Sequence, residues 1–584
     1  MEQTVTKTAE SKTKRKFSCD LRWTVIFSAV LGAILFIAIY GVRILDPTYD
    51  EWLFAGGDLT QHYIGWLYFR ETGWHFPLGV TEGLLGSIKT SMVYTDSFPF
   101  MAIFFKILSP ILPRPFQYYG IMGLTIFILN GASASLLIHK FNKNPVFCIL
   151  GSTLFIVSPT VMHRLYGHET LACHFFIILS FCLWAYQDHK WKKKWQNLAM
   201  PALLWTLLCV GAVGTHMYFV PMIYFVMLGC LITDIFKYKK MIRPISCFVS
   251  STVFSLITMW VIGAFYGEGD TASYGLGRTS ANMNTFWNPF RLNSKVFTGY
   301  ECAPSKFLLP RAKLDGQYEG YTYLGLGVLI AVFAALLILF SCIERKGKKS
   351  KIYFLSVLYN KRIPLIACIV VFVLAMFMAI SPVGTFDDKI LYTIKYPDSI
   401  EKLLATFRAS GRFAWVAQYM IYTGILYAFS KISLKKTSVA ALAVCLGIQL
   451  ADISPQIYSR RWYKEYQAHY NILKDARWEK LAKDCDKFYG LPYDQPEKYS
   501  YDFAQFAYEH NMTTNHFSVA RPPLDDIIHQ YYDVINDITN GTADPKALYV
   551  FFQPELIPQV EGLKIYEIDG LYVVKCPNQP DPLQ

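Results

Sequence analysis

The sequence predicts a polytopic α-helical membrane protein of about eleven transmembrane helices, followed by a small extracytoplasmic α/β domain. The first observation behind this fold class is composition: the 584 residues are 53% hydrophobic and only 17% charged, whereas soluble chains average about 25% charged residues. The second is the length of apolar runs such as Trp23–Val42, which can cross about 30 Å of hydrocarbon as a helix. The third is that basic residues gather in every second link between these runs, as they do in cytoplasmic loops.

The apolar runs and the links between them predict the topology. Basic links, from "KTKRK" before the first run to "SKISLKK" before the last, alternate with long or basic-poor links. Because positive charge marks the cytoplasmic side, we expect a multi-pass plasma-membrane protein with a cytoplasmic N-terminus and an extracytoplasmic C-terminus. The net charge of +13 then lies at the membrane surface, so we expect membrane lipids and no nucleic acid as partners. The runs lie at 23–43, 116–138, 145–161, 170–187, 197–214, 217–235, 244–266, 321–342, 363–381, 412–430 and 437–451.

One further apolar segment, Phe98–Pro113, tests this topology. It is short, and Lys106, Pro110 and Pro113 interrupt it. If it crossed the membrane, every later basic link would face outward, against the usual bias. We therefore expect this segment to lie at, or dip into, the outer interface.

Two parts of the chain lie outside the predicted spans. Residues 1–22 form a basic cytoplasmic tail, and no small-residue cleavage site follows the first apolar run, so we expect that run to remain as an uncleaved helix. Residues 453–584 alternate polar helix-like stretches with β-rich ones, and Asp569-Gly570 between two of the latter is a hairpin signal. This pattern predicts a small α/β domain, packed over the outer loops. The thirteen cysteines show no metal-ligand spacing.

Titratable residues gather in the predicted outer links rather than in the spans. The spans contain essentially no Asp, Glu, Lys or Arg in their interiors, which disfavours a proton-coupled transporter because such residues mark proton pathways. The link "MHRLYGHETLACH" instead brings together His163, Arg164, His168 and Glu169. A carboxylate beside imidazoles can hold a divalent cation or transfer protons. The alternative is an ordinary capping and anchoring loop.

The segment "FRASGRFAW" leads two arginines into the tenth span. Arg408 and Arg412 are four residues apart, so on a helix they would share a face. Paired guanidinium groups can hold a phosphate or pyrophosphate headgroup through bidentate hydrogen bonds. The alternative is snorkelling beside bulk lipid headgroups, although positive charge on the outer side runs against the usual bias.

The overall arrangement resembles a known class of enzymes. A long first outer loop at 44–115 with an early aspartate, a large outer loop at 267–320, eleven spans and an outside C-terminal domain together resemble the GT-C class of membrane glycosyltransferases. This class includes oligosaccharyltransferases, protein mannosyltransferases and aminoarabinose transferases. The strings "GGDLTQHYIGWLYFRETGWHFPLG", "SMVYTDSFPF", "GHETLACH" and "FRASGRFAW" also resemble an uncharacterised bacterial branch of the class. The resemblance implies a GT-C-like catalytic membrane module at 23–320 and additional transmembrane helices at 321–452.

The resemblance also implies a reaction. A sugar would pass from a polyprenyl-phosphate-linked donor to an acceptor hydroxyl, with inversion, at the outer face of the membrane. The acceptor would be a cell-envelope glycan, lipid or protein. Such a hydroxyl needs a carboxylate base, and Asp58 in "GGDLTQH" best matches the catalytic aspartate of the class, with Asp50 and Glu51 as competitors. The glycines beside Asp58 would let the backbone approach the substrate closely.

The resemblance extends to the remaining site residues. Arg408 and Arg412 are the expected cations at the leaving phosphate. Glu169, with His168, matches the position at which some members hold a second acidic residue or a metal ligand. No D-x-D motif occurs there, so dependence on a divalent cation, Mg²⁺ or Mn²⁺, stays open, and Asp96 is an alternative for the same role. The other residues expected to bind substrate are His62, His163 and Arg164.

The stretch after Asp58, "LTQHYIGWLYF", predicts an interfacial helix. On a helix, His62, Trp66 and Phe69 lie along one face, and Gln61 and Tyr68 lie on another. Aromatic side chains of this kind hold helices at headgroup depth, so we expect this helix to lie over lipid.

Three other functions stay open. A transporter or flippase for a lipid-linked sugar needs no base, but it should show a polar path through the spans. A polymer ligase or hydrolase at the outer face would use a carboxylate pair, such as Asp58 with Glu169. A non-catalytic scaffold that presents the C-terminal domain would leave the clustered outer-loop residues unexplained.

Overall fold

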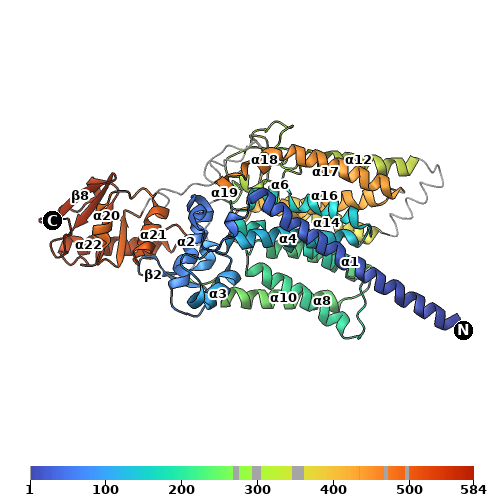
Figure 1. Ribbon diagram of the computed structural model, residues 1–584, viewed down its shortest axis with the longest axis horizontal. Helices are drawn as coiled ribbons and strands as arrows, with labels where there is room; N and C mark the ends of the chain where they lie inside the picture. The colour runs from blue at the N-terminus through green and yellow to red at the C-terminus, as the bar shows by residue number, and fades with distance from the viewer. Residues whose placement is uncertain are drawn as a thin grey trace. The chain divides into compact units, whose positions relative to one another are not determined.

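The computed structural model describes residues 2–267, 275–291, 304–344, 361–432, 434–465, 471–493 and 499–583 (Figure 1). Parts of the predicted loop at 267–320, and most of the basic link at 344–362, lie outside these residues. The described chain is mainly helical and forms two compact units. We call them the helical unit (Met1–Pro47, Tyr118–Ser255 and Ser273–Glu465) and the mixed unit (Thr48–Gln117, Leu256–Ala272 and Tyr466–Gln584).

Helices build the helical unit, and most of them are long and apolar. Their order along the chain is α1 (Glu2–Tyr40), α4 (Tyr119–His139), α5 (Pro145–Ile156), α6 (Pro159–Arg164), α7 (Phe175–Ala185), α8 (Gln196–Val213), α9 (Phe219–Phe236), most of α10 (Ile242–Val261), α12 (Leu326–Glu344), α14 (Arg362–Ile380), α15 (Asp398–Ala405), α16 (Ala414–Ser430), α17 (Lys435–Asp452), α18 (Ser454–Ser459) and α19 (Trp462–Glu465).

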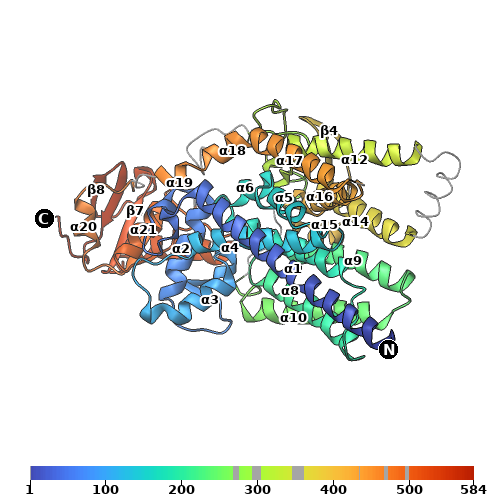
Figure 2. The same cartoon turned by 45° about the vertical axis from the view of Figure 1, so that its right-hand side comes forward.

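Close glycine contacts join α1 to α4, and Figures 1 and 2 both draw these two helices side by side. A Cβ atom on Gly32 of α1 would lie 2.4 Å from the carbonyl oxygen of Phe127, and one on Gly131 of α4 would lie 2.5 Å from that of Ser28. Small residues let the backbones of membrane helices approach each other in this way. The pair therefore packs as two spans of one bundle.

Seven helices of the described chain are long and apolar enough to cross a membrane: Leu21–Tyr40, Tyr119–His139, Pro145–Arg164, Gln196–Val213, Phe219–Phe236, Ile242–Val261 and Arg362–Ile380. The bent pair Lys435–Asp452 and Ser454–Lys464, with an angle of 53°, makes an eighth if it is one span. These are the helices of a multi-pass membrane protein. Each predicted run contains a helix, but α7 has only 11 residues and α16 has 17, so the count of eleven spans stays a prediction.

The apolar segment at 98–113 folds into a short helix, α3 (Pro99–Leu108), which is followed by the 3₁₀ turn η4 (Ser109–Ile111). Ten residues of helix span about 15 Å, half of the hydrocarbon thickness. The helix has one exposed and one buried face, since Phe104 and Ile107 are exposed whereas Ala102 and Lys106 are buried. It is not among the helices long enough to span, as the sequence predicted.

The C-terminal part of the mixed unit is the predicted α/β domain. Its five-stranded sheet has the order β6-β5-β7-β9-β8, with β5 parallel to both β6 and β7, and β9 antiparallel to β7 and β8. Asp569 and Gly570 both take positive φ between β8 and β9, which confirms the predicted hairpin. The elements are α20 (Arg477–Ala482), β5 (Lys487–Leu491), α21 (Ser500–Glu509), β6 (Thr513–Thr514), α22 (Leu524–Asn540), β7 (Ala547–Phe551), β8 (Lys564–Ile568) and β9 (Leu571–Lys575).

Helices cover both faces of this sheet. On one face, Trp478 of α20 and Phe503 of α21 pack in a cluster with side chains of the central strands. On the other face, Val534 and Ile538 of α22 pack in a second cluster. Burial of both faces explains why β7, "ALYVF", is apolar throughout rather than alternating.

The predicted first outer loop and the C-terminal domain fold together in the mixed unit. The loop contributes η2 (Glu51–Phe54), α2 (Gly57–Glu71) and the hairpin β1 (Val80–Leu85) and β2 (Ile88–Ser91). Gln61 Nε2 donates to the carbonyl of Ser518 at 2.6 Å, and Tyr68 Oη donates to that of Ala504 at 3.1 Å. The Gly86 amide donates to the carbonyl of Thr514 at 2.7 Å. These bonds confirm that the domain packs over this loop.

Helix α2 is buried on all sides, so the predicted interfacial helix over lipid is wrong. His62, Trp66 and Phe69 are fully buried, and Tyr68 is nearly so. The physical reason is that α2 carries apolar side chains around its whole circumference, as a helix inside a protein core does. Within the mixed unit, it packs against α21 and the β1 strand.

Candidate functional site

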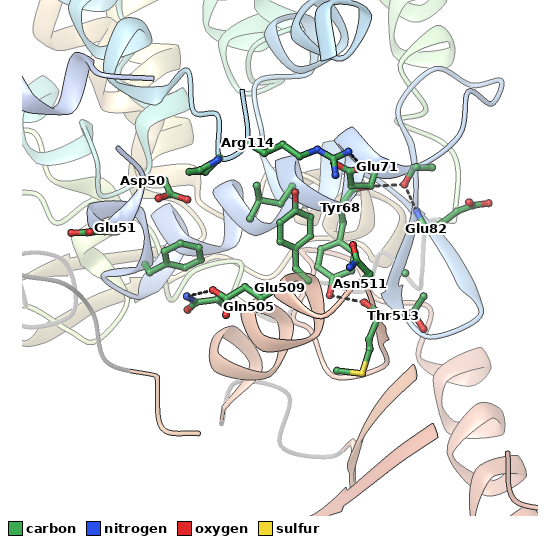
Figure 3. Close-up of a pocket in the computed structure, with 17 residues that line it drawn as sticks. Asp50, Glu51, Tyr68, Glu71, Glu82, Arg114, Gln505, Glu509, Asn511 and Thr513 are labelled. Atoms are coloured by element: carbon green, nitrogen blue, oxygen red, sulfur yellow. Dashed lines mark hydrogen bonds and ion pairs between the residues drawn. The ribbon is translucent and has the colours of Figure 1, made fainter. Parts of the chain in front are cut away.

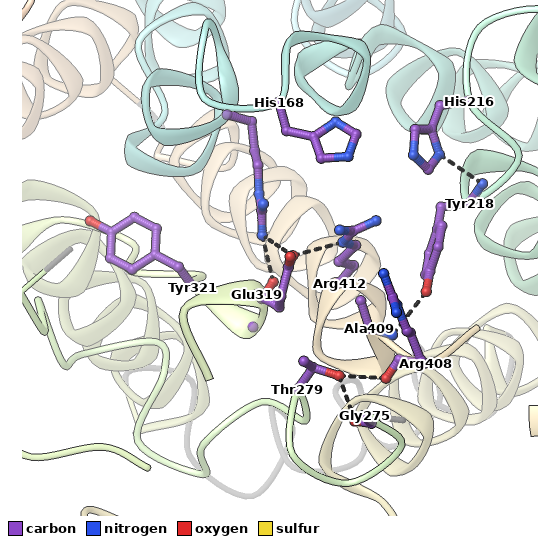
Figure 4. Close-up of polar contacts among 12 residues, drawn as sticks. His168, His216, Tyr218, Gly275, Thr279, Glu319, Tyr321, Arg408, Ala409 and Arg412 are labelled. Carbon is purple, nitrogen blue, oxygen red and sulfur yellow. Dashed lines mark hydrogen bonds and ion pairs between the residues drawn. The ribbon is translucent and has the colours of Figure 1, made fainter. Parts of the chain in front are cut away.

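A buried ion-pair cluster lies in the helical unit (Figure 4). Glu319 Oε2 accepts hydrogen bonds from Arg164 Nη2 at 2.7 Å and from Arg412 Nε at 2.9 Å. All three residues are less than a tenth exposed. Burial alone would raise the pKa of Glu319, but the charges of Arg164 and Arg412 outweigh burial and hold that pKa well below its usual range. Glu319 is therefore a carboxylate that binds two guanidinium groups.

Close backbone approaches position the three residues. Arg164 lies in the last turn of α6, Glu319 lies in η6 (Gln317–Gly320) and Arg412 lies in η7 (Ser410–Phe413). A Cβ atom on Gly411 would lie 2.6 Å from the Cα of Gly320, so the contact between η6 and η7 requires glycine. The Arg164 guanidinium also donates to the carbonyl of Glu319 at 2.9 Å, which ties η6 to α6.

The structure corrects the prediction that Arg408 and Arg412 share a helix face. Helix α15 ends at Ala405, and η7 begins only at Ser410, so no helix runs from Arg408 to Arg412. The reason is local, because Ala409 has a non-helical backbone conformation and Ser410-Gly411 is a poor helix-forming pair. Arg408 is exposed, whereas Arg412 is buried.

The two arginines nevertheless meet at Tyr218, as Figure 4 shows. The guanidinium carbon of Arg412 lies 4.5 Å from the centre of the Tyr218 ring, a cation–π distance. The charge of Arg408 also acts on Tyr218. The Tyr218 hydroxyl accepts a hydrogen bond from the backbone amide of Ala409, between the two arginines, at 2.8 Å. Tyr218 therefore fixes the "FRASGR" turn.

Histidines lie beside this cluster. The rings of His168 and His216 lie 5.3 Å apart, and Figure 4 draws both near Arg412. His163 makes an edge-on contact with Tyr321, with ring centres 5.2 Å apart. Of the residues predicted from the link at 162–174, the structure thus places three near the ion-pair cluster: His163, Arg164 and His168. The fourth, Glu169, is buried in η5 (Glu169–Ala172).

The mixed unit brings together His62 and Asp96, two of the predicted substrate-binding residues. A ring nitrogen of His62 and a carboxylate oxygen of Asp96 lie within 4.8 Å of each other. The hydroxyl of Ser97 donates to the carbonyl of His62 at 2.7 Å, which joins the "VYTDSFPF" segment to α2. An imidazole and a carboxylate are two of the ligands that a divalent cation takes, and a catalytic zinc site uses at least three protein ligands.

The candidate bases occupy two places in the mixed unit. Asp50 and Glu51 line a cleft of about 700 Å³ (Figure 3). Tyr63 Oη donates to Asp50 Oδ2 at 2.7 Å, yet burial outweighs this bond and raises the pKa of Asp50. Asp58 is half-buried in the first turn of α2 and is not among the residues that line the cleft.

The glycines before Asp58 are required by the backbone. Gly56 and Gly57 have φ values of 93° and 69°, a region that favours glycine. Thr60 then fixes the start of α2, since its Oγ1 accepts from the Gly56 amide and donates to the carbonyl of Leu53, both at 2.7 Å. The expected glycine turn before Asp58 is therefore present.

Sequence reasoning missed Glu319, Tyr218 and the C-terminal wall of the cleft. Glu319 lies 155 residues from Arg164 and 93 from Arg412, so no local spacing links them. A physical argument could have indicated a residue such as Glu319, because arginines buried at the end of an apolar helix need a carboxylate partner. The sequence predicted that the C-terminal domain packs over the outer loops, but no local pattern indicated that α21 would line a cleft there.

Comparison with known proteins gives a family and no function. The family model described as "Domain of unknown function (DUF6311)" matches residues 29–454, and that of the "DUF6311 C-terminal domain" matches residues 477–577. A search of curated proteins finds no match. The two matched segments correspond to the apolar helices with their first loop and to the α/β domain. Since the first match covers well over half of the chain, the protein belongs to the DUF6311 family.

Proposed function

We propose that this protein is a membrane glycosyltransferase of the GT-C class. It transfers a sugar from a polyprenyl-phosphate-linked donor to an acceptor hydroxyl of a cell-envelope glycan, lipid or protein, with inversion. The observation that carries the proposal is the pairing of two guanidinium groups, those of Arg164 and Arg412, with one carboxylate, Glu319, beside Tyr218, on which the charge of Arg408 also acts. Their combined charge is positive, which suits an anionic lipid phosphate.

The cluster supplies a fixed cation where the leaving group needs one. As the bond between the sugar and the phosphate oxygen breaks, negative charge develops on the lipid phosphate, and preorganised cations stabilise this charge best. Arg412 is held by Glu319 and by the Tyr218 ring, so its orientation is set before the donor binds. The start of α16 at Ala414, just beyond Arg412, adds the positive end of a helix dipole. The exposed Arg408 is the group that can contact the phosphate directly.

The acceptor needs a base, and the first loop supplies candidates. The acceptor oxygen bonds to the anomeric carbon while the electron pair of the broken bond leaves with the phosphate, and the hydroxyl proton passes to a carboxylate. Asp58 is the first candidate, with its glycine turn for close approach. Asp50 is the second, because a pKa raised by burial makes a carboxylate a stronger base.

The proposal includes the finer topology. Eleven spans, with the N-terminus in the cytoplasm and the C-terminal domain outside the plasma membrane, would place both the first loop and the "FRASGR" turn on the outer side. The alternation of basic and basic-poor links along the sequence supports this. His168 and Glu169 are the further expected site residues of the helical unit, and a divalent cation, Mg²⁺ or Mn²⁺, would act there only together with further ligands.

The test is transfer by the full-length protein in lipid vesicles. The vesicles receive radiolabelled polyprenyl-phosphate sugars and extracted membrane acceptors, with and without a chelator, and the measurement is label transfer coupled to release of lipid phosphate. We expect transfer by the wild type, its loss in folded Asp58→Asn or Asp50→Asn, and normal transfer by Glu555→Gln, a control at an exposed carboxylate of the C-terminal domain. Label that crosses the bilayer unchanged, indifferent to both Asp variants, would overturn the enzyme and favour a flippase.

A further inference from the structure

Two segments that lie far apart in the sequence form the walls of the cleft in the mixed unit. Its volume of about 700 Å³ lies within the range of pockets that hold small ligands, about 300–1,000 Å³. One wall comes from the first loop, with Asp50 before α2 and Glu71 at its end, and the other comes from α21, with Tyr508 and Glu509. Figure 3 shows the carboxylates of both walls around the same space. A ligand here would bind the first loop and the C-terminal domain at once.

The lining is acidic, although the protein as a whole is basic. Five carboxylates line the cleft, against a single guanidinium, that of Arg114. Arg114 Nη2 lies 2.6 Å from Glu71 Oε2, so these two charges compensate each other. Glu82 Oε1 pairs with Lys89 at 2.5 Å. Two of the remaining carboxylates, those of Asp50 and Glu509, define the end of the cleft where a cation would be attracted.

Neutral groups satisfy these two carboxylates. Asp50 Oδ2 accepts from the hydroxyl of Tyr63 at 2.7 Å, and Glu509 Oε1 accepts from the amide of Gln505 at 2.9 Å. The negative charges of Glu51 and Glu509 act on Asp50 and help to raise its pKa, after burial itself. A bound cation would relieve this repulsion between negative charges.

Aromatic side chains form part of the lining. Tyr68 and Tyr508 contact each other across the two walls, with ring centres 5.7 Å apart, and Phe54 also lines the cleft. Aromatic faces offer contact area to the C–H faces of sugar rings, and they also attract cations. Carboxylates accept hydrogen bonds from hydroxyl and ammonium groups alike. An anionic ligand is disfavoured by the charge of the cleft.

We propose that this cleft binds an amino-bearing saccharide, with the protonated amine between Asp50 and Glu509 and the sugar ring against Tyr68 and Tyr508. That this saccharide belongs to the acceptor rests on the proposed function, whereas the binding itself does not. A cationic sugar meets both features of the cleft, because its ring covers the aromatic lining and its amine compensates the carboxylates. The ligand class is thus set by charge as well as by shape.

The test measures binding rather than catalysis. The full-length protein in nanodiscs of zwitterionic lipid is titrated calorimetrically with a glucosamine tetramer at mildly acidic pH, where its amines are protonated, and with the N-acetylated form of the same tetramer, which is neutral. We expect the cationic tetramer to bind at least about tenfold more tightly, and this preference to shrink at high salt. Glu509→Gln, an exposed position, should remove most of the preference without changing the affinity for the neutral tetramer.

Matched controls separate the outcomes. Glu561→Gln changes an exposed carboxylate elsewhere in the C-terminal domain and should keep the wild-type preference. Equal affinity of the wild type for the two tetramers, no binding of either, or a preference that survives Glu509→Gln would each overturn the amine site. Transfer activity in the vesicle assay without any preference for the amine would overturn the amine site and would not contradict the proposed function. Amine-selective binding without any transfer would instead overturn the proposed function and leave the site.

Discussion

Arg412 Nε and Glu319 Oε2 lie 2.9 Å apart in a buried ion pair that joins two turns 93 residues apart in the sequence. The same carboxylate oxygen holds Arg164 at 2.7 Å. Two guanidinium groups thus share one carboxylate away from water, and the turn that carries Arg408 is fixed at its far end by this pair. The arrangement gives Glu319 a structural role and leaves Arg408 as the group closest to solvent.

Replacing Glu319 with glutamine should destabilise the protein strongly. The substitution keeps the shape of the side chain but leaves Arg164 and Arg412 buried without a compensating charge, a change that typically costs about 3–5 kcal/mol. We expect a clear fall in the melting temperature of the protein in nanodiscs. Glu401→Gln in α15, where the side chain is exposed, is the control and should melt as the wild type does. A Glu319→Gln protein with an unchanged melting temperature would show that the ion pair does not stabilise the fold.

The substitution Gly65→Ala should disturb the contact between α2 and the segment that carries Asp96. A Cβ atom at position 65 would lie 2.2 Å from Thr95 Oγ1, so Thr95 must move, at a cost of about 1–3 kcal/mol for an overpacked site. We expect a lower melting temperature. The control is Gly424→Ala in α16, where a Cβ atom would meet nothing within 4 Å and where alanine favours the helix. Equal melting temperatures of the two variants would contradict the prediction.

Lys106 should make the stability of the mixed unit depend on pH in the alkaline range. Burial lowers the pKa of Lys106 from 10.5 to about 8, although Glu82 and Glu71 oppose this shift. The ammonium also lies over two rings, 4.0 Å from the centre of Phe69 and 4.9 Å from that of Trp74. Between about pH 8 and 10.5 the unfolded chain therefore binds a proton that the folded chain has lost.

The sign of the effect follows from this difference. The free energy of unfolding should rise as the pH increases through this window, by about 1.4 kcal/mol for each unit of pKa shift. Lys106→Met should lack this rise, while Lys546→Met, at an exposed lysine of the same unit, should keep it. The measurement is the midpoint of chemical denaturation at several pH values. Parallel pH curves for the wild type and Lys106→Met would refute the prediction.

Local sequence signals predicted the elements well where one segment decides its own structure. Apolar runs located the helices, and Asp569-Gly570 located the hairpin between β8 and β9. The sequence also contained a signal against the interfacial placement of α2, since Leu59, Ile64 and Phe69 distribute apolar side chains around the helix. That signal favours a buried helix, whereas the aromatic content of the segment led to the prediction of an interfacial one.

The candidate site was less predictable because its contacts join distant segments. The regular spacing of Arg408 and Arg412 suggested one helix face, but Ser410-Gly411 lets the chain turn between them. The balance of charge at Glu319, and the cleft wall from α21, depend on tertiary packing that no local pattern encodes. The sequence therefore located the titratable residues and not the way in which they pair.

Arg408 should affect donor binding more than stability, in contrast to Arg412. The Arg408 side chain is exposed, and the hydrogen bond that holds this residue uses its backbone carbonyl, which accepts from Thr279 Oγ1 at 2.5 Å. Arg408→Gln should therefore leave the melting temperature unchanged and raise KM for the polyprenyl-phosphate donor about tenfold, as the loss of one charged hydrogen bond of about 1.5–3 kcal/mol would. Arg408→Lys should recover part of this loss, because an ammonium keeps the charge but not the bidentate geometry. Arg412→Gln should instead lower the melting temperature, since Glu319 loses one of its two partners. If Arg408→Gln left KM unchanged, the turn would not bind the donor phosphate, and the positive cluster would be structural alone.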